Sequence, residues 1–342
     1  MLIQSSFSMV QGSVLHVPLW NRAPLNLSAG TRVFAAALLD DSPVLPEIVV
    51  TTFPPDIWGD LWRIELDVYQ SPGLLAQVLG LLRDQRVHIL AAESTALDAG
   101  HVHAISLLAD CRDYASNGDL TTDARSQMQR PELRDLHAYL AATFIKDFVF
   151  ANGETPRLRV RRLYSYYRCR ERLRSGELGS TVDLVINNGE LFLPDAIMEP
   201  VRDSLGAPAD PIRAMILTDS KDRIMRVLFS LPNTGVIHIR VFFRYAVHVP
   251  ALILSIIDQA SFDIIRSQLR QGLFRPPSNL RPAISTEYAT LDLLLKNLYA
   301  ESTASDQDLL AVIRSRLTTT QELNGYDATV ELAKFIPPKR EA

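Results

Sequence analysis

The stretch with the densest functional chemistry runs from residue 157 to residue 174. It holds eight arginines, three tyrosines and one acidic residue. Clustered guanidinium groups bind phosphate oxygens and interleaved aromatic rings stack on bases, so this stretch could hold a nucleotide, a nucleic acid or an acidic protein. The interpretation we favour is a charged edge strand that resists aggregation and forms salt bridges. The candidate anion-binding residues are Arg157, Arg159, Arg161, Arg168 and Arg172.

Residues that could form a catalytic or metal site are scattered along the chain. His101 and His103 could share one face of a strand, but zinc sites usually have three or four protein ligands. The sequence contains no Walker A motif, no glycine-rich dinucleotide motif and no nucleophile elbow. No nucleophile, base and orienting group can be placed together. We therefore expect no enzyme activity, no metal and no cofactor.

A second chemically promising stretch lies between Trp62 and Ala109. Apolar and charged residues alternate over 62–68, which predicts a half-buried strand. A Ser-Pro-Gly turn at 71–73 follows, and five apolar residues on one stripe predict a helix over 74–83. Strands are expected over 87–95 and 102–109. The glycine of the turn would let backbone N–H groups approach a ligand closely.

This succession resembles the ACT domain, a small ligand-sensing module, through Ser71-Pro-Gly-Leu-Leu75, Val78, Leu79, Leu82 and Val87-His-Ile89. The resemblance implies that a small effector, often an amino acid, contacts the first strand–helix turn and the neighbouring second strand. Gln70 stands where relatives often have Asp. The residues implied to bind ligand are Gln70, Ser71, Pro72, Gly73, Leu74, Leu75, Glu93 and Ser94, with His248 and Pro250 in a second copy of the turn.

Similar stretches recur along the chain. The helix at 72–85 corresponds to 250–259, and the segments 12–17, 37–42 and 44–50 correspond to 179–184, 215–220 and 223–229. We therefore expect an α+β protein of two homologous halves. Each half would be a β-rich lead segment plus a ferredoxin-like, ACT-like β-α-β-β-α-β unit. The expected segments are 1–60 (lead), 61–175 (first unit), 176–235 (second lead) and 236–342 (second unit).

Composition bounds the function. A net charge of −4 does not predict nucleic-acid binding, and no apolar run is long enough to span a bilayer. Cys111 and Cys169 have no metal-like spacing, and the chain start lacks a signal-peptide pattern, so we expect a cytoplasmic protein. The predicted function is non-catalytic sensing of a small effector, an amino acid before others, coupled to a protein partner or to self-association as a dimer. The alternative is a nucleotide or nucleic-acid binding protein that uses residues 157–174.

Overall fold

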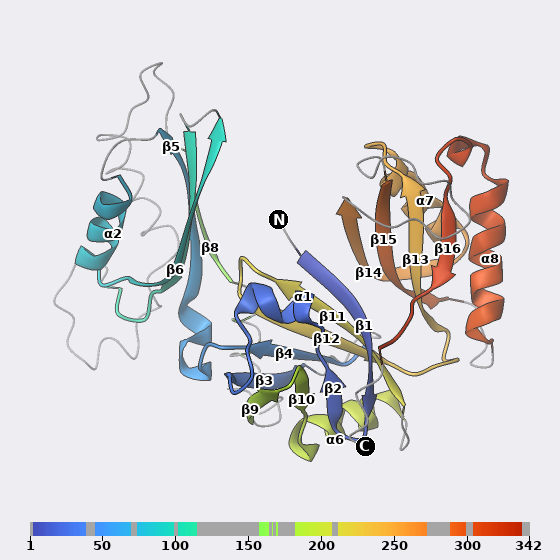
Figure 1. Ribbon diagram of the computed structural model, residues 1–342, viewed down its shortest axis with the longest axis horizontal. Helices are drawn as coiled ribbons and strands as arrows, with labels where there is room; N and C mark the ends of the chain where they lie inside the picture. The colour runs from blue at the N-terminus through green and yellow to red at the C-terminus, as the bar shows by residue number, and fades with distance from the viewer. Residues whose placement is uncertain are drawn as a thin grey trace. The chain divides into compact units, whose positions relative to one another are not determined.

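The computed structural model describes residues 3–38, 45–69, 74–98, 102–114, 157–163, 166, 169, 182–206, 211–271, 288–298 and 304–336. The chain divides into two compact units (Figure 1). The barrel unit comprises Met1–Thr52 and Leu178–Ala342, and the single-sheet unit comprises Phe53–Glu177. In the described part of the chain, no helix is long and apolar enough to cross a bilayer.

Eight strands of the barrel unit close into an antiparallel barrel in the order β1-β11-β12-β4-β3-β9-β10-β2 (Figure 1). The first lead segment supplies β1 (Ile3–Gln11), β2 (Val14–His16), β3 (Arg32–Leu38) and β4 (Glu47–Thr51). The second supplies β9 (Val182–Asn187), β10 (Glu190–Phe192), β11 (Ile212–Asp219) and β12 (Ile224–Ser230).

The barrel shows that the predicted fold class is wrong. The chain is not an α+β protein of two separate halves with ferredoxin-like units. The part of the chain that the structure describes is mostly β, with one closed eight-stranded barrel and two four-stranded sheets. Each lead segment alone would expose unpaired strand edges, whereas interleaving the two segments closes a barrel and removes those edges.

The two sets of barrel strands are related by an internal two-fold exchange. Replacing β1–β4 by β9–β12, and the reverse, leaves the cyclic strand order unchanged. Under this exchange Leu15 and Leu191, which are ladder partners, swap places, and so do the ladder partners Ile48 and Val227. Four seams, β1–β11, β12–β4, β3–β9 and β10–β2, each join one lead segment to the other.

The registers refine the sequence correspondence. Ala36 pairs with Val49 as Met215 pairs with Leu228, so Ala36 takes the place of Met215. The predicted correspondence of 37–42 with 215–220 is therefore one residue out of register. Segment 44–50 matches 223–229 in the register predicted, with Ile48 opposite Val227.

Apolar side chains fill the barrel interior, as is usual in eight-stranded barrels, and short helices add to the same core. The helix α1 (Leu19–Arg22) and the 3-10 turn η1 (Ala23–Leu25) follow β2, and α6 (Asp195–Leu205) follows β10. Both helices have a proline at the N-cap. Leu25 of η1 and Ile197 of α6 lie in the barrel core. The short helical segments after β2 and β10 therefore contribute side chains to the barrel core.

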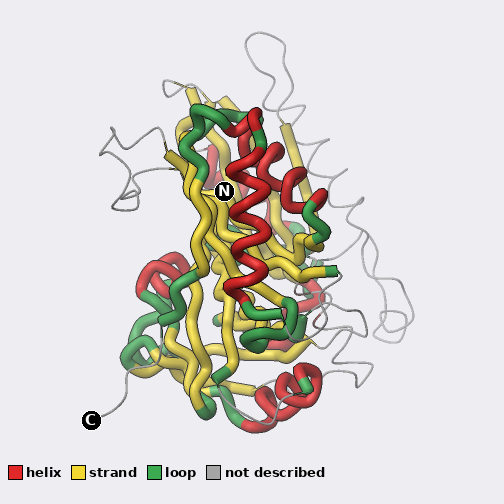
Figure 2. The backbone as a smooth tube through the Cα atoms, turned by 90° about the vertical axis from the view of Figure 1, so that its right-hand side faces the viewer, coloured by secondary structure: helices red, strands yellow, loops and turns green. Residues whose placement is uncertain are grey.

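A four-stranded sheet packs beside the barrel within the same unit. Its order is β14-β15-β13-β16, from β13 (Val236–Arg244), β14 (Phe262–Gln271), β15 (Tyr288–Asn297) and β16 (Thr329–Leu332). One face packs on α7 (Val249–Gln259) and α8 (Asp306–Thr319), and η3 (Gln321–Leu323) follows α8. Figure 2 looks onto α8, which lies along the strands.

The other face of this sheet docks on the outside of the barrel. Val236 and Leu294 pack against Phe7, Met215 and Leu228. Asp292, fully buried, accepts hydrogen bonds from Ser5 Oγ at 2.6 Å and Arg240 Nε at 2.6 Å, and pairs with Arg270. Because barrel and sheet share both an apolar cluster and buried ionic contacts, this sheet is buried on two sides.

The single-sheet unit contains η2 (Pro55–Asp60), β5 (Leu61–Tyr69), α2 (Leu74–Asp84), β6 (His88–Asp98), β7 (Val102–Asp110) and β8 (Arg157–Arg162). Its strand order is β6-β7-β5-β8. Val78 and Leu82 of α2 pack on Trp62, Ile64 and Leu66 of β5. The strands and helix predicted between Trp62 and Ala109 are confirmed.

Candidate functional site

The start of α2 and the adjacent strand β6 form the part of the implied ligand site that the structure describes. Gln70, Ser71, Pro72 and Gly73 lie outside the described residues. Leu74 is the first residue of α2, and the Leu75 side chain is 36% exposed although Val78, one turn later, is fully buried. The helix therefore begins at the surface, directly after the predicted turn, and enters the core only at its second turn.

Glu93 and Ser94 lie on opposite faces of the sheet. Ser94 is opposite Ile105, whose side chain packs in the core beneath α2, so Ser94 is on the α2 side. Glu93 is opposite Ser106 and faces away from α2. Both are exposed on an edge strand. Of the two, only Ser94 shares a sheet face with the start of α2, and a single small effector there cannot contact both side chains.

The corresponding turn in the barrel unit is exposed at His248 and contacts the loop before β16. Val249 is fully buried at the start of α7, and Pro250 occupies its first turn. His248 Nε2 lies 3.1 Å from the hydroxyl of Tyr326, and the two rings meet edge to face at 5.4 Å. The loop before β16 therefore reaches the place where a ligand of this second turn would bind.

Of the exposed β8 arginines, Arg159 faces a carboxylate, whereas Arg161 is directly opposite Arg63. Arg159 is directly opposite Glu65, on the sheet face away from α2, and Arg157 is the first residue of the strand. Side chains at opposite ladder positions have their Cβ atoms about 5 Å apart, so the charges of Arg159 and Glu65 compensate each other. Arg159 and Arg161 are exposed. Arg168 and Arg172 lie outside the described residues.

The tyrosines that favoured base stacking are not all available for it. Tyr166 is fully buried, and its ring lies edge-on to Trp58 at 6.3 Å and to Phe53 at 6.2 Å. Cys169, three residues later, is also fully buried. One of the three tyrosines is therefore held in the core and is not free to stack on a base.

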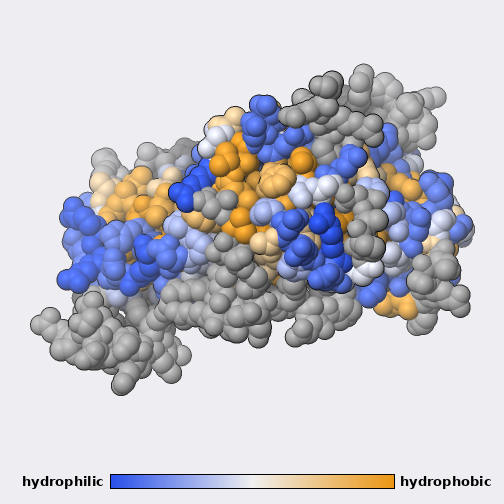
Figure 3. Space-filling view, turned by 90° about the horizontal axis from the view of Figure 1, so that it is seen from below, coloured by the Kyte–Doolittle hydropathy of each residue, from blue (hydrophilic) through white to orange (hydrophobic). Residues whose placement is uncertain are grey.

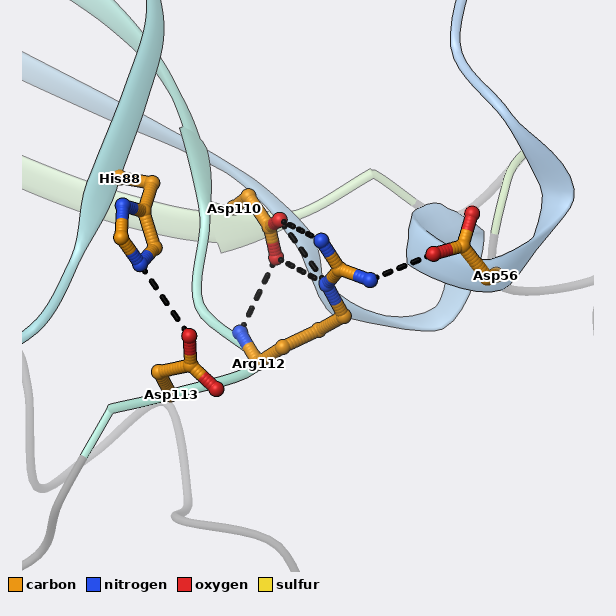
Figure 4. Close-up of polar contacts among 5 residues, drawn as sticks. All are labelled: Asp56, His88, Asp110, Arg112 and Asp113. Carbon is orange, nitrogen blue, oxygen red and sulfur yellow. Dashed lines mark hydrogen bonds and ion pairs between the residues drawn. The ribbon is translucent and has the colours of Figure 1, made fainter.

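A polar cluster missed by the sequence reasoning lies at one end of the sheet (Figure 4). Arg112 donates to both oxygens of buried Asp110, at 3.0 and 3.2 Å from Nε, and to Asp56 of η2 at 2.5 Å. These contacts, the hydrogen bond to Asp110 first, raise the pKa of Arg112. Nearby, His88 Nε2 lies 3.2 Å from Asp113. Since two carboxylates already hold the guanidinium, the cluster ties η2 to the end of β7 and is not an anion site.

Nucleophile and metal chemistry find little support in the described residues. Burial raises the pKa of the Cys111 thiol, which is therefore protonated and unreactive at neutral pH. Among the described residues, no group of three or more His, Cys, Asp or Glu side chains is placed to hold a metal ion.

The sequence matches no protein-family model and no curated protein. It is similar to a crystal structure of an unknown protein from Galdieria sulphuraria, at 8% identity and TM-score 0.27, covering 80% of this chain and 99% of the other. It is also similar to a candidate glycine cleavage system transcriptional repressor, at 6% identity and TM-score 0.23, covering 80% of this chain and 97% of the other. At these TM-scores the likeness supports no inference.

Proposed function

We propose that the chain is a non-catalytic, cytoplasmic regulatory protein whose single-sheet unit binds a small effector, an amino acid or a molecule of similar size. The effector would lie beside the N-terminal end of α2, and its binding would change how the protein meets a protein partner. In this proposal the single-sheet unit and the β13–β16 sheet are two modules, and in each the first strand leads into a helix. No membrane or cofactor takes part.

One observation carries the proposal: the two modules differ in what surrounds the start of the helix that follows the first strand. In the single-sheet unit, Leu75 and the β6 residues from Ala92 to Thr95 are exposed. In the barrel unit, Val249 at the start of α7 is fully buried, Tyr326 contacts the exposed His248, and the sheet docks on the barrel. We assign effector binding to the first module and a scaffolding role to the second. The size of any response equals the difference in effector affinity between two states of the protein.

The test is thermal unfolding of the full chain against the amino acids and common nucleotides. A ligand at a hundredfold excess over its Kd stabilises by about 2.7 kcal/mol. Ser94→Phe, on the α2 side of β6, should remove the shift, as should Gly73→Val in the turn. Thr95→Phe is the matched control, because Thr95 lies one residue away on the opposite face. Stabilisation that survives both Ser94→Phe and Gly73→Val would overturn the proposed site.

The second candidate function, nucleotide or nucleic-acid binding, is favoured only by the exposure of Arg159 and Arg161 on the edge strand β8. It predicts an affinity for single-stranded nucleic acid that falls steeply with salt and is lost in Arg159→Glu. Binding that is weak at low salt, or unchanged by Arg159→Glu, would remove this candidate.

A further inference from the structure

The outer surface of the barrel at β9, β10 and β2 carries large apolar side chains in solvent. Leu191 and Leu15 point into the barrel core, so their neighbours along β10 and β2 point outward. Phe192 is 62% exposed and Val185 is 54% exposed. Figure 3 views the barrel from the side where α6 lies, and apolar side chains gather near the middle of that face. Contiguous exposed apolar patches, unlike single exposed side chains, mark interaction sites.

The outward residues of β10 and β2 form two rows across the seam. Phe192 is directly opposite Val14, and Glu190 is directly opposite His16. One row is therefore apolar, and the other pairs an acid with a base. The internal two-fold of the barrel passes between the rows, because Leu15 and Leu191 are opposite each other at the centre.

This arrangement is complementary to itself in one orientation. Consider two copies that face each other across a two-fold axis parallel to the strands. Each β10 residue of one copy then lies against the β2 residue of the second copy that is its ladder partner within a single chain. Phe192 then meets Val14 of the second copy, and Glu190 meets His16 of the second copy. An axis perpendicular to the strands would instead place Glu190 against Phe192 and His16 against Val14, so that each polar side chain would be buried against an apolar one. Homodimers are mostly of this isologous, two-fold type.

We propose that the outer face of β10 and β2, which we call the seam face (Val14, His16, Glu190 and Phe192), binds the same face of a second copy of this chain. Apolar complementarity in one row and charge complementarity in the other select the second copy as the partner. The face is only a few short strands wide, below the ~800 Å² per partner of a stable interface. The dimer is therefore reversible and depends on protein concentration.

The first experiment is sedimentation equilibrium of the full chain over a wide concentration range. We expect a monomer–dimer equilibrium that Phe192→Glu weakens at least tenfold, about 1.4 kcal/mol. Val312→Glu is the matched control, because Val312 is an exposed apolar residue on α8, 46% exposed. A wild-type chain that stays monomeric throughout, or an equal loss in Val312→Glu, would overturn the proposal.

The second experiment tests the orientation. In Glu190→Lys the new lysine would face His16 of the partner copy, and in His16→Glu the new glutamate would face Glu190 of the partner copy, so each variant should dimerise poorly. A mixture of the two variants restores opposite charges at both contacts, so it should form a heterodimer with wild-type affinity. Two variants that do not associate on mixing, although both keep the wild-type thermal midpoint, would refute the seam-face dimer. This outcome would leave the effector proposal untouched.

Discussion

His238 makes the folded state sensitive to acid. The side chain lies on β13, fully buried where the sheet docks on the barrel. Its Nε2 is 2.7 Å from Ser230 Oγ, and its ring meets Phe7 and Phe335 edge to face at 5.6 and 5.2 Å. Burial, and then the charge of Arg213, lower the pKa of His238 from 6.5 to about 3. The imidazole is therefore neutral at pH 7.

The direction and size of the pH effect follow from that shift. In the unfolded chain His238 titrates near 6.5, so below this pH the unfolded state takes up a proton that the folded state refuses. The contribution of the neutral His238 to the free energy of unfolding is therefore fully present above about pH 6.5, and it is lost as the pH falls towards about 3. One proton corresponds to about 1.4 kcal/mol per pH unit, so stability falls by roughly 2 kcal/mol between pH 6.5 and about pH 5.

The assay compares wild type with His238→Gln, whose neutral amide can keep the contact to Ser230. Urea unfolding, read by hydrogen exchange of β13 peptides, reports the barrel unit separately from the single-sheet unit. We expect the stability of wild type relative to the variant to fall below pH 6.5 with the slope given above. His88→Gln, whose ring lies at the surface, is the control. A wild-type-to-variant difference that does not change with pH would refute the burial argument.

Two further predictions concern the barrel unit. Asp292→Asn leaves Arg240 and Arg270 without their buried counter-charge, so we expect the free energy of unfolding in urea to fall by about 3–5 kcal/mol. The control is Asp195→Asn, which removes an exposed carboxylate 3.9 Å from Arg202 and should cost under about 0.5 kcal/mol. Equal losses in the two variants would contradict the role of burial. Gly189 has φ +87°, and an added Cβ would lie 2.9 Å from Arg22 Nη2. Gly189→Ala should therefore lower the thermal midpoint by the equivalent of roughly 1–2 kcal/mol, and by more than Gly12→Ala, whose φ of +63° is also left-handed but whose Cβ would meet nothing within 4 Å.

Local elements were predictable and the barrel was not. Alternation over 62–68 and the apolar stripe over 74–83 depend on neighbouring residues, and both elements are present. The barrel depends on pairs such as Ser5 with Leu217 and Ile48 with Val227, which are far apart in the chain. Short strands alternate in the same way in a barrel and in an open sheet, so the pattern of each lead segment carries no sign of its partner.

The sequence indicated which segments lie beside the candidate site, but it did not indicate which way their side chains point. The second strand beside the turn was expected to face a ligand as one stretch. A register shift between Ile89 and Ala91 changes which β6 residues face α2, and it leaves Ser94 on that side and Glu93 on the other. One extra residue in a strand leaves no mark in hydrophobic periodicity. For the same reason the compensation of Arg159 by Glu65 appears only in the register of β5 and β8.

The interleaved seams also set the timing of folding during synthesis. β1 leaves the ribosome roughly 200 residues before β11, its neighbour in the barrel. At about 5–20 residues per second, β1 to β4 wait on the order of 10–40 s with open edges and exposed core side chains. Such non-local pairing also makes folding slow once the chain is complete. The nascent N-terminal segment is thus the aggregation-prone part of the protein until the last of the β9–β12 strands emerges.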